Sequence, residues 1–231
     1  MKWIYIIAGI ALYIKMLVLP NLTPESLGWL ELTEGELGGI SVIEALVQET
    51  GVPNAVSGII FRNRLYDTIF EVVVFTLSIM GVRFLLSDEQ PTPTVYQFTD
   101  QPSIVLARLG ATIAALIAVE LAIRGHLSPG GGFAAGVAGG TAIGLVAITA
   151  SSEYMESLYQ RWQAARWEKI SVLVFIILSI VSLLGISLAP GEMGTLTSGG
   201  WIPVLNVLVA IKVALGSWAA VLLFIRYRGL L

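Results

Sequence analysis

Cysteine is absent from this 231-residue chain, and charged residues are few. Without cysteine the chain forms neither a disulfide nor a thiolate metal site. Only 13% of the residues are charged and no run of lysine or arginine occurs, so nothing in the sequence indicates nucleic-acid binding. The one histidine, His126, has no second histidine to share a metal with. We therefore expect no metal site, no cofactor and no nucleic-acid partner.

Catalytic signatures are missing as well. No nucleophile stands beside a base, no phosphate-binding loop follows a strand, and no dinucleotide-binding fingerprint occurs. The sequence therefore predicts that the chain is not an enzyme by itself.

Long apolar runs are what the chain has instead. Hydrophobic residues make up 56% of it, and several runs approach the roughly 20 residues that cross a bilayer. We predict an all-α integral membrane protein with about six transmembrane helices. The first run lacks a small-residue cleavage site, so it is expected to be a retained helix and not a signal peptide. The predicted spans are 3–19, 67–86, 103–124, 132–150, 170–189 and 203–225.

Loop charges orient these spans. The stretch 21–53 holds several glutamates but no lysine or arginine, whereas 151–169 carries Arg161, Arg166 and Lys169. Because cytoplasmic loops are rich in basic residues, 151–169 and the C-terminus are predicted to be cytoplasmic, as is 87–101, and 21–53 to be external. Aromatic residues alternate with charge in 151–169, which predicts an amphipathic helix at the lipid headgroups.

A polar, proline-containing stretch divides the chain in two. Residues 1–87 are expected to form an N-terminal helix pair, 88–102 a linker, and 103–231 a four-helix bundle. Within the first part, 54–64 is apolar but too short to span, so it is predicted to lie in the interface or to pack as a half-helix.

A glycine-rich loop joins two of the predicted spans. It reads Gly-His-Leu-Ser-Pro-Gly-Gly-Gly-Phe over 125–133, and Ser128 and Pro129 favour the N-cap and first residue of the next helix. Glycine then recurs every fourth residue, which leaves one face of the helix without side chains. We call this set the glycine ladder and predict that another helix packs on it: Gly132, Gly136, Gly140 and Gly144.

Ionisable residues inside predicted spans are the candidates for function, because each costs several kcal/mol in the bilayer unless paired or hydrated. Asp67 and Glu71 lie four residues apart near the start of one span, and Glu120 lies near the end of the next. Lys212 is near the middle of the last span. Antiparallel threading brings the first three toward the same side of the membrane, with Lys212 deeper. The candidate ion-path residues are Asp67, Glu71, Glu120, His126 and Lys212.

Simpler interpretations remain open for most of them. Asp67 can form an interfacial ion pair with Arg64, and Glu120 can be neutralised by Arg124. His126 can cap or pack in its loop. Lys212 is too deep to reach water cheaply, so either a functional role or a buried ion pair is expected.

Two motifs resemble a known family. The loop 125–133 is similar to the signature loop of the MnhB/MrpB family, whose members are subunits of Mrp-type multisubunit sodium/proton antiporters. The run 202–213, with Asn206 and Lys212, resembles that family's last helix. Upstream, 54–71 resembles the C-terminal end of the large subunit of the same antiporters and the matching small subunit of membrane-bound hydrogenase and sulfur-reductase complexes. The chain thus resembles a fusion of two neighbouring subunits.

This resemblance implies a multi-pass subunit in a large ion-exchanging assembly. Its partners would be other antiporter membrane subunits, with Na⁺ and H⁺ as the transported ions. A prokaryotic plasma membrane is expected, with the thylakoid as the alternative. The chain would contribute to the cation path and to assembly. Two alternatives stay open: a membrane-arm subunit of a redox-driven ion pump, such as a hydrogenase or quinone-linked dehydrogenase, and a purely structural subunit.

Overall fold

The computed structural model describes residues 42–92, 95 and 97–229. All regular secondary structure in these residues is helical, which confirms the predicted all-α fold. From Leu46 onward, the described residues form one compact unit. The predicted span 3–19 lies outside the described residues. The helices are α2 (Val42–Thr50), α3 (Ala55–Gly58), the π-helical turn η2 (Ile59–Asn63), α4 (Leu65–Leu85), α5 (Gln101–Arg124), α6 (Gly132–Ala147), α7 (Ser152–Arg161), α8 (Ala164–Leu183) and α9 (Ile202–Arg228).

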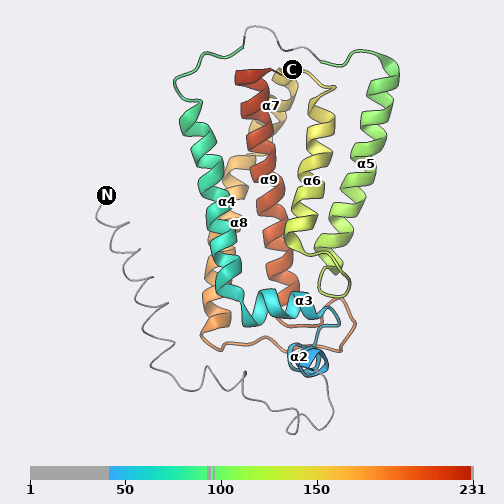
Figure 1. Ribbon diagram of the computed structural model, residues 1–231, viewed down its shortest axis with the longest axis vertical. Helices are drawn as coiled ribbons and strands as arrows, with labels where there is room; N and C mark the ends of the chain where they lie inside the picture. Colours follow the sequence, from blue (N-terminus) through green and yellow to red (C-terminus); the bar gives the residue numbers. More distant parts are fainter. Residues whose placement is uncertain (1–41, 93–94, 96, 230–231) are drawn as a thin grey trace, which may run out of the picture. The chain divides into compact units, whose positions relative to one another are not determined.

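Helix α9 is the centre of the unit. It packs against α4, α5, α6 and α8, and α5 packs mainly on α6 (Figure 1). Helices α4 and α5 therefore lie on different sides of α9. We call one end of the bundle the α3 end, where α3, the α5–α6 loop and the start of α9 meet. The other is the α7 end, formed by α7, the last turns of α9 and the segment before α5.

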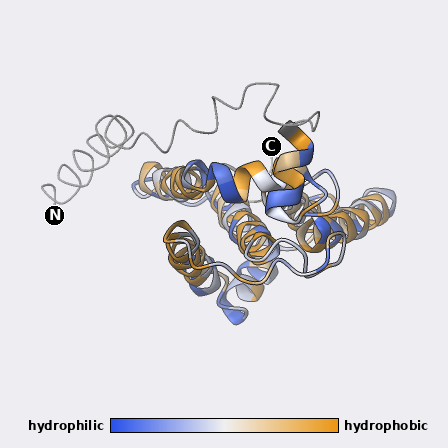
Figure 2. Cartoon of the chain, turned by 90° about the horizontal axis from the view of Figure 1, so that it is seen from below, coloured by the Kyte–Doolittle hydropathy of each residue, from blue (hydrophilic) through white to orange (hydrophobic). Residues whose placement is uncertain are grey.

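The predicted spans correspond to α4, α5, α6, α8 and α9 within the described part of the chain. Three of these helices, α4, α5 and α9, are long and apolar enough to cross a membrane, and α6 is a shorter apolar helix. Seen end-on, the bundle carries hydrophobic residues around its outside (Figure 2). On α5, for example, Leu106, Leu109 and Leu116 are exposed. Such outward apolar faces are those of a protein surrounded by lipid or by other membrane subunits.

The predicted boundaries of one span were wrong. Helix α8 begins at Ala164 and ends at Leu183, whereas the sequence predicted 170–189. It begins directly after Gln163, whose positive φ of 50° interrupts the helical conformation between α7 and α8. It ends because Gly185 adopts a φ of 83°, outside the helical region. Residues 164–169, predicted as loop, are thus the first turns of a bundle helix.

Helix α6 begins at Gly132, as in the predicted span 132–150, and not at the Ser128–Pro129 cap that the local pattern favoured. Its N-cap is Gly131, with a φ of 108°, and the preceding Gly130 has a φ of 152°. These conformations are accessible to glycine and strained for other residues, so the glycines delay the helix until Gly132.

The short elements match the expectations for their segments. Residues 54–64 form α3 and η2, which cross the α3 end before the chain turns into α4 (Figure 1). Helix α7 lies in the segment predicted to be amphipathic, and Ser151 caps it by accepting a 3.2 Å bond from the Tyr154 amide. The linker is attached to the bundle: the Thr92 amide donates to the Arg226 carbonyl at 2.9 Å.

Candidate functional site

The most deeply buried charges in the described residues form an ion pair. Lys212 Nζ lies 2.8 Å from Glu168 Oε1, and the two side chains are 0% and 9% exposed. Lys212 comes from the middle of α9 and Glu168 from the second turn of α8, so the pair lies between these two helices. In a membrane each charge alone would cost several kcal/mol, and pairing offsets much of that cost.

An aromatic ring and a glycine complete the surroundings of the pair. Lys212 Nζ lies 4.6 Å from the ring centroid of Phe75 on α4, a cation–π distance. A Cβ added to Gly216 would lie 3.1 Å from Lys212 Nζ and 2.6 Å from Phe75 Cε1. The ammonium therefore occupies space that the missing side chain of Gly216 leaves, one turn further along α9 than Lys212 itself. Three helices and one glycine shape this site.

The other candidate carboxylates do not reach the pair. Asp67 is hydrogen-bonded to Arg64, whose Nε donates to Asp67 Oδ2 at 2.6 Å. Glu120 forms a 3.3 Å ion pair with Arg124, and its side chain is 59% exposed. Glu71 is exposed on α4. All three lie toward the α3 end of α4 and α5, as the antiparallel threading predicted, but α4 and α5 are held apart by α9.

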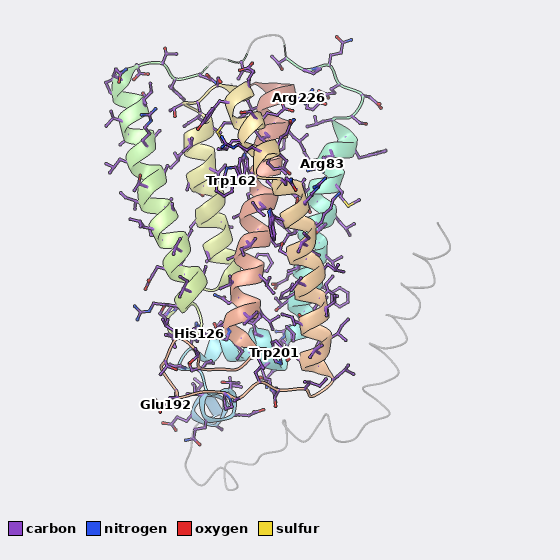
Figure 3. All side chains as sticks on the ribbon, turned by 180° about the vertical axis from the view of Figure 1, so that it is seen from behind. Arg83, His126, Trp162, Glu192, Trp201 and Arg226 are labelled. Carbon is purple, nitrogen blue, oxygen red and sulfur yellow. The ribbon has the colours of Figure 1, made fainter. Side chains whose placement is uncertain are left out.

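His126 is buried in the glycine-rich loop at the α3 end (Figure 3). Its Nε2 lies 3.3 Å from the Thr195 carbonyl oxygen, and its Nδ1 has no hydrogen-bond partner among the described residues. Burial lowers the pKa of this imidazole, while the carbonyls of Thr195 and Leu196 act in the opposite direction. The side chain is therefore held in its neutral form at pH 7.

Asn54 ties this loop to the segment before α3. Its Nδ2 donates to the carbonyls of Gly125 at 2.7 Å and Ser128 at 2.8 Å, and its amide donates to the His126 carbonyl at 3.2 Å. Ser57 Oγ also donates to the Gly125 carbonyl, at 2.7 Å. The upstream segment 54–64 and the glycine-rich loop are thus joined by hydrogen bonds, and three loop carbonyls, those of Gly125, His126 and Ser128, already have donors.

Asn206 holds the end of α5 against α9. Its Nδ2 donates to the carbonyls of Leu121 at 3.1 Å and Ala122 at 2.7 Å, which lack helical partners at that terminus. Asn206 is 0% exposed. A Cβ on Gly125 would lie 2.6 Å from Asn206 Nδ2, so this approach requires glycine.

The glycine ladder faces α9 of the same chain. A Cβ on Gly132 would lie 2.5 Å from the Asn206 carbonyl oxygen, and one on Gly140 would lie 2.6 Å from Ser217 Cβ. A Cβ on Gly136 would overlap Val213 and lie 2.9 Å from the Ala210 oxygen. A Cβ on Gly144 has no such neighbour within 4 Å, so the close approach ends one turn before α6 does.

Sequence reasoning missed two residues of these arrangements, Glu168 and Asn54. Glu168 lies among Arg166, Trp167 and Lys169, so its local composition resembles an interfacial loop. The signal that was available is Lys212 itself, because a lysine at mid-membrane requires a partner. The sequence pattern assigned Asn54 no role of its own, only a place at the start of the apolar segment 54–64 and of the resemblance over 54–71. In the part of the chain that the structure describes, no three His, Cys, Asp or Glu side chains gather to hold a metal ion.

This geometry defines a class of protein: a membrane helix bundle in which a buried ion pair lies beside a helix that is packed through its glycines. The family described as "Domain related to MnhB subunit of Na+/H+ antiporter" matches residues 102–219. The chain belongs to this family, which confirms the resemblance carried by the 125–133 loop and the last helix. The chain is a multi-pass membrane protein. No curated protein matches the sequence significantly.

Two solved structures share the fold. One is from the membrane-bound sulfane sulfur reductase, an archaeal respiratory membrane complex, with a TM-score of 0.62 and 23% identity over 95% of this chain and 99% of that chain. The other is from the Mrp complex of Dietzia sp. DQ12-45-1b, with a TM-score of 0.56 and 18% identity over 82% of this chain and 22% of that one. The resemblance of residues 54–71 to the large antiporter subunit stays a prediction.

Proposed function

We propose that the chain is a membrane subunit of a cation/proton antiporter-like complex and that the Glu168–Lys212 pair is part of its ion path. The observation that carries the proposal is the full burial of Lys212 against Glu168 at 2.8 Å in the middle of the bundle. Family membership over residues 102–219 supports the transport role. The two structural relatives, both in multisubunit membrane complexes, support the assembly.

The pair suits ion exchange for a simple electrostatic reason. The Glu168 carboxylate can be neutralised by the Lys212 ammonium, by a proton or by a bound cation such as Na⁺, a hard ion that prefers oxygen ligands. Because the site has little access to water, each change of partner alters the local field strongly. A proton arriving at Glu168 frees Lys212 to act on neighbouring charges, and its departure draws the ammonium back.

The remaining candidates are proposed to extend the path where other subunits meet the chain. Glu71 and Glu120 are exposed on spanning helices, a costly position if only lipid covered them. Partner subunits that hydrate or pair these carboxylates would remove that cost. Asp67 and His126 lie toward the same α3 end, so a cation path at that boundary would pass these side chains before it reached Lys212.

A second function has one observation in its favour. The sulfane sulfur reductase relative aligns over nearly all of both chains, so the same module serves a respiratory complex in that case. A redox-driven pump would place its cofactors on other chains. Purification of the intact complex separates the two functions: iron–sulfur or nickel–iron proteins that co-purify would indicate the redox complex.

The ion path is tested by removing both charges together. In the double variant Glu168→Gln with Lys212→Met no unpaired buried charge is left, so the complex should assemble normally. Sodium-dependent proton exchange in membrane vesicles, measured per amount of complex, should fall to background. Either single variant would instead leave one buried charge without a partner, at a cost of about 3–5 kcal/mol in stability.

Lys169→Met is the matched control. It removes the same charge from the neighbouring position of α8, but Lys169 is exposed and outside the pair. Its exchange should equal that of the wild type. Normal exchange in the double variant would overturn the ion-path proposal and leave a structural role as the remaining function.

A further inference from the structure

A cavity at the α7 end lies above the buried ion pair on the same faces of α4 and α9. It has a volume of about 510 Å³ and is partly open to the outside. Both polar and apolar side chains line it, and its charged residues come from α4, α7 and α9: Arg83, Glu153, Glu156 and Arg226. Figure 3 shows Arg83 and Arg226 at this end of the bundle. A space of this size lined by polar groups is suited to hold water.

One face of α9 leads from the pair to the cavity. Lys212, Gly216 and Ala219 follow one another at helical spacing, and Ala219 is the first of them that lines the cavity. Lys212 Nζ lies level with Gly216, 3.1 Å from the position of its missing Cβ. From Gly216 to Ala219 the helix rises only about 4.5 Å. The ammonium thus points toward the cavity, although helical side chains normally lean toward the N-terminus.

Helix α4 repeats this arrangement. Phe75, which covers the Lys212 ammonium, and Arg83, which lines the cavity, lie two turns apart on one face, with the buried Ile79 between them. On both α4 and α9, the residue at the ion pair and the residue at the cavity therefore lie on one face of the helix, about two turns apart.

Tyr159 links the wall of the cavity to the interior of the bundle. Its ring lines the cavity and packs edge-on against Trp218, with the ring centroids 5.2 Å apart. Its hydroxyl accepts a 3.4 Å hydrogen bond from Arg83 Nη2. Burial raises the pKa of this hydroxyl, Arg83 lowers it and the negative charge of Glu168 raises it, so the hydroxyl lies within electrostatic range of Glu168. The Nε1 of Trp218 is buried without a hydrogen-bond partner among the described residues.

We propose that this cavity is the aqueous entry through which protons reach the Glu168–Lys212 pair from the α7 end, with Tyr159 as its inner gate. The species that passes Tyr159 is the proton and not a hydrated metal ion, because the Tyr159 hydroxyl can relay a proton while its ring is packed edge-on against Trp218. In the transfer, a hydronium ion in the cavity loses a proton and becomes water, and an O–H bond forms on Glu168. The inference rests on the proposed function for the role of the pair, but the water route is tested without transport.

Cysteine labelling in the intact complex tests the route, since the chain has no cysteine of its own. A membrane-impermeant cationic methanethiosulfonate should react with Ala219→Cys from the α7 side only. Leu222→Cys, which also lines the cavity, should react from the same side and serves if the first variant does not assemble. Val209→Cys, on α9 on the other side of Lys212 and 0% exposed, should not react. If neither cavity position reacts, or if either reacts from the α3 side, the inference is overturned.

The gate is tested by Tyr159→Phe, which keeps the ring contact with Trp218 and removes only the hydroxyl. Exchange should slow several-fold with unchanged complex content, and labelling of Ala219→Cys should persist in the same background. Full exchange in Tyr159→Phe would overturn the relay. Cysteine labelling tests the water route whether or not the double variant at Glu168 and Lys212 loses exchange. The water-entry proposal and the ion-path proposal can therefore fail independently of each other.

Discussion

Asn54 donates a hydrogen bond from Nδ2 to the carbonyl of Gly125 at 2.7 Å, although 71 residues separate them in the chain. The same amide group reaches Ser128. One side chain before α3 therefore fixes the loop that carries His126 and precedes the glycine ladder. This relationship gives the two sequence motifs a common structural role, because the upstream segment supports the downstream loop.

Asn54→Ala should loosen the 125–131 loop. The Ser128 carbonyl loses its Asn54 donor, and Gly125 keeps only Ser57, for an expected loss of about 1–3 kcal/mol in stability. Hydrogen exchange of the loop amides should become faster and the melting temperature should fall. Asn63→Ala, at an exposed position at the end of η2, is the control and should change neither. Unchanged loop protection in Asn54→Ala would show that the bonds are dispensable.

Gly136→Leu should separate α6 from α9. The new side chain would collide with Val213 and with the Ala210 carbonyl, and overpacking of this kind costs about 1–3 kcal/mol or more. Thermal melting of the purified protein and its recovery in the complex measure the effect. Gly144→Leu is the matched control on the same ladder, since no heavy atom lies within 4 Å of its added Cβ. Equal stability of the two variants would contradict the close packing seen at Gly136.

The α7 end should face the cytoplasm. Arg161, Arg166 and Lys169 lie at this end and follow the basic bias of cytoplasmic loops. Arg166→Cys and Glu192→Cys place single thiols at exposed positions on the two ends of the bundle. An impermeant thiol reagent should label the first only in inside-out vesicles and the second only in right-side-out vesicles. Labelling of both from one side would show that the predicted threading is wrong.

Stability should fall in mild acid because of His126. Its folded-state pKa is lowered from 6.5 mainly by burial, so below pH 6.5 the unfolded chain takes up a proton that the folded chain resists. The contribution to stability is complete above the unfolded pKa and is lost as pH falls below it. The melting temperature of the wild type should therefore drop between pH 7 and 5 by more than that of His126→Gln. Parallel curves for the two proteins would show that His126 is not the group that titrates.

The sequence by itself determined the class and most of the helices. Apolar runs of spanning length are a local property, and a bilayer permits few structures other than helices for them, so α4, α5 and α9 could be predicted within a few residues. The 125–133 loop and the run 202–213 were sufficient to indicate the family. Proximity of Asp67, Glu71 and Glu120 to one end of the bundle followed from antiparallel threading alone.

Only the tertiary structure decided which residues meet. Lys212 indicated the need for a partner, but its partner lies 44 residues away, in a turn whose charges made it resemble a loop. Nothing local distinguishes Glu168 from its exposed neighbour Lys169 until α8 packs on α9. Likewise, α6 does not begin at the Ser128–Pro129 cap, because Gly130 and Gly131 adopt positive φ angles. Helix formation is settled by nearby residues and the solvent, whereas pairing between helices depends on how distant segments pack.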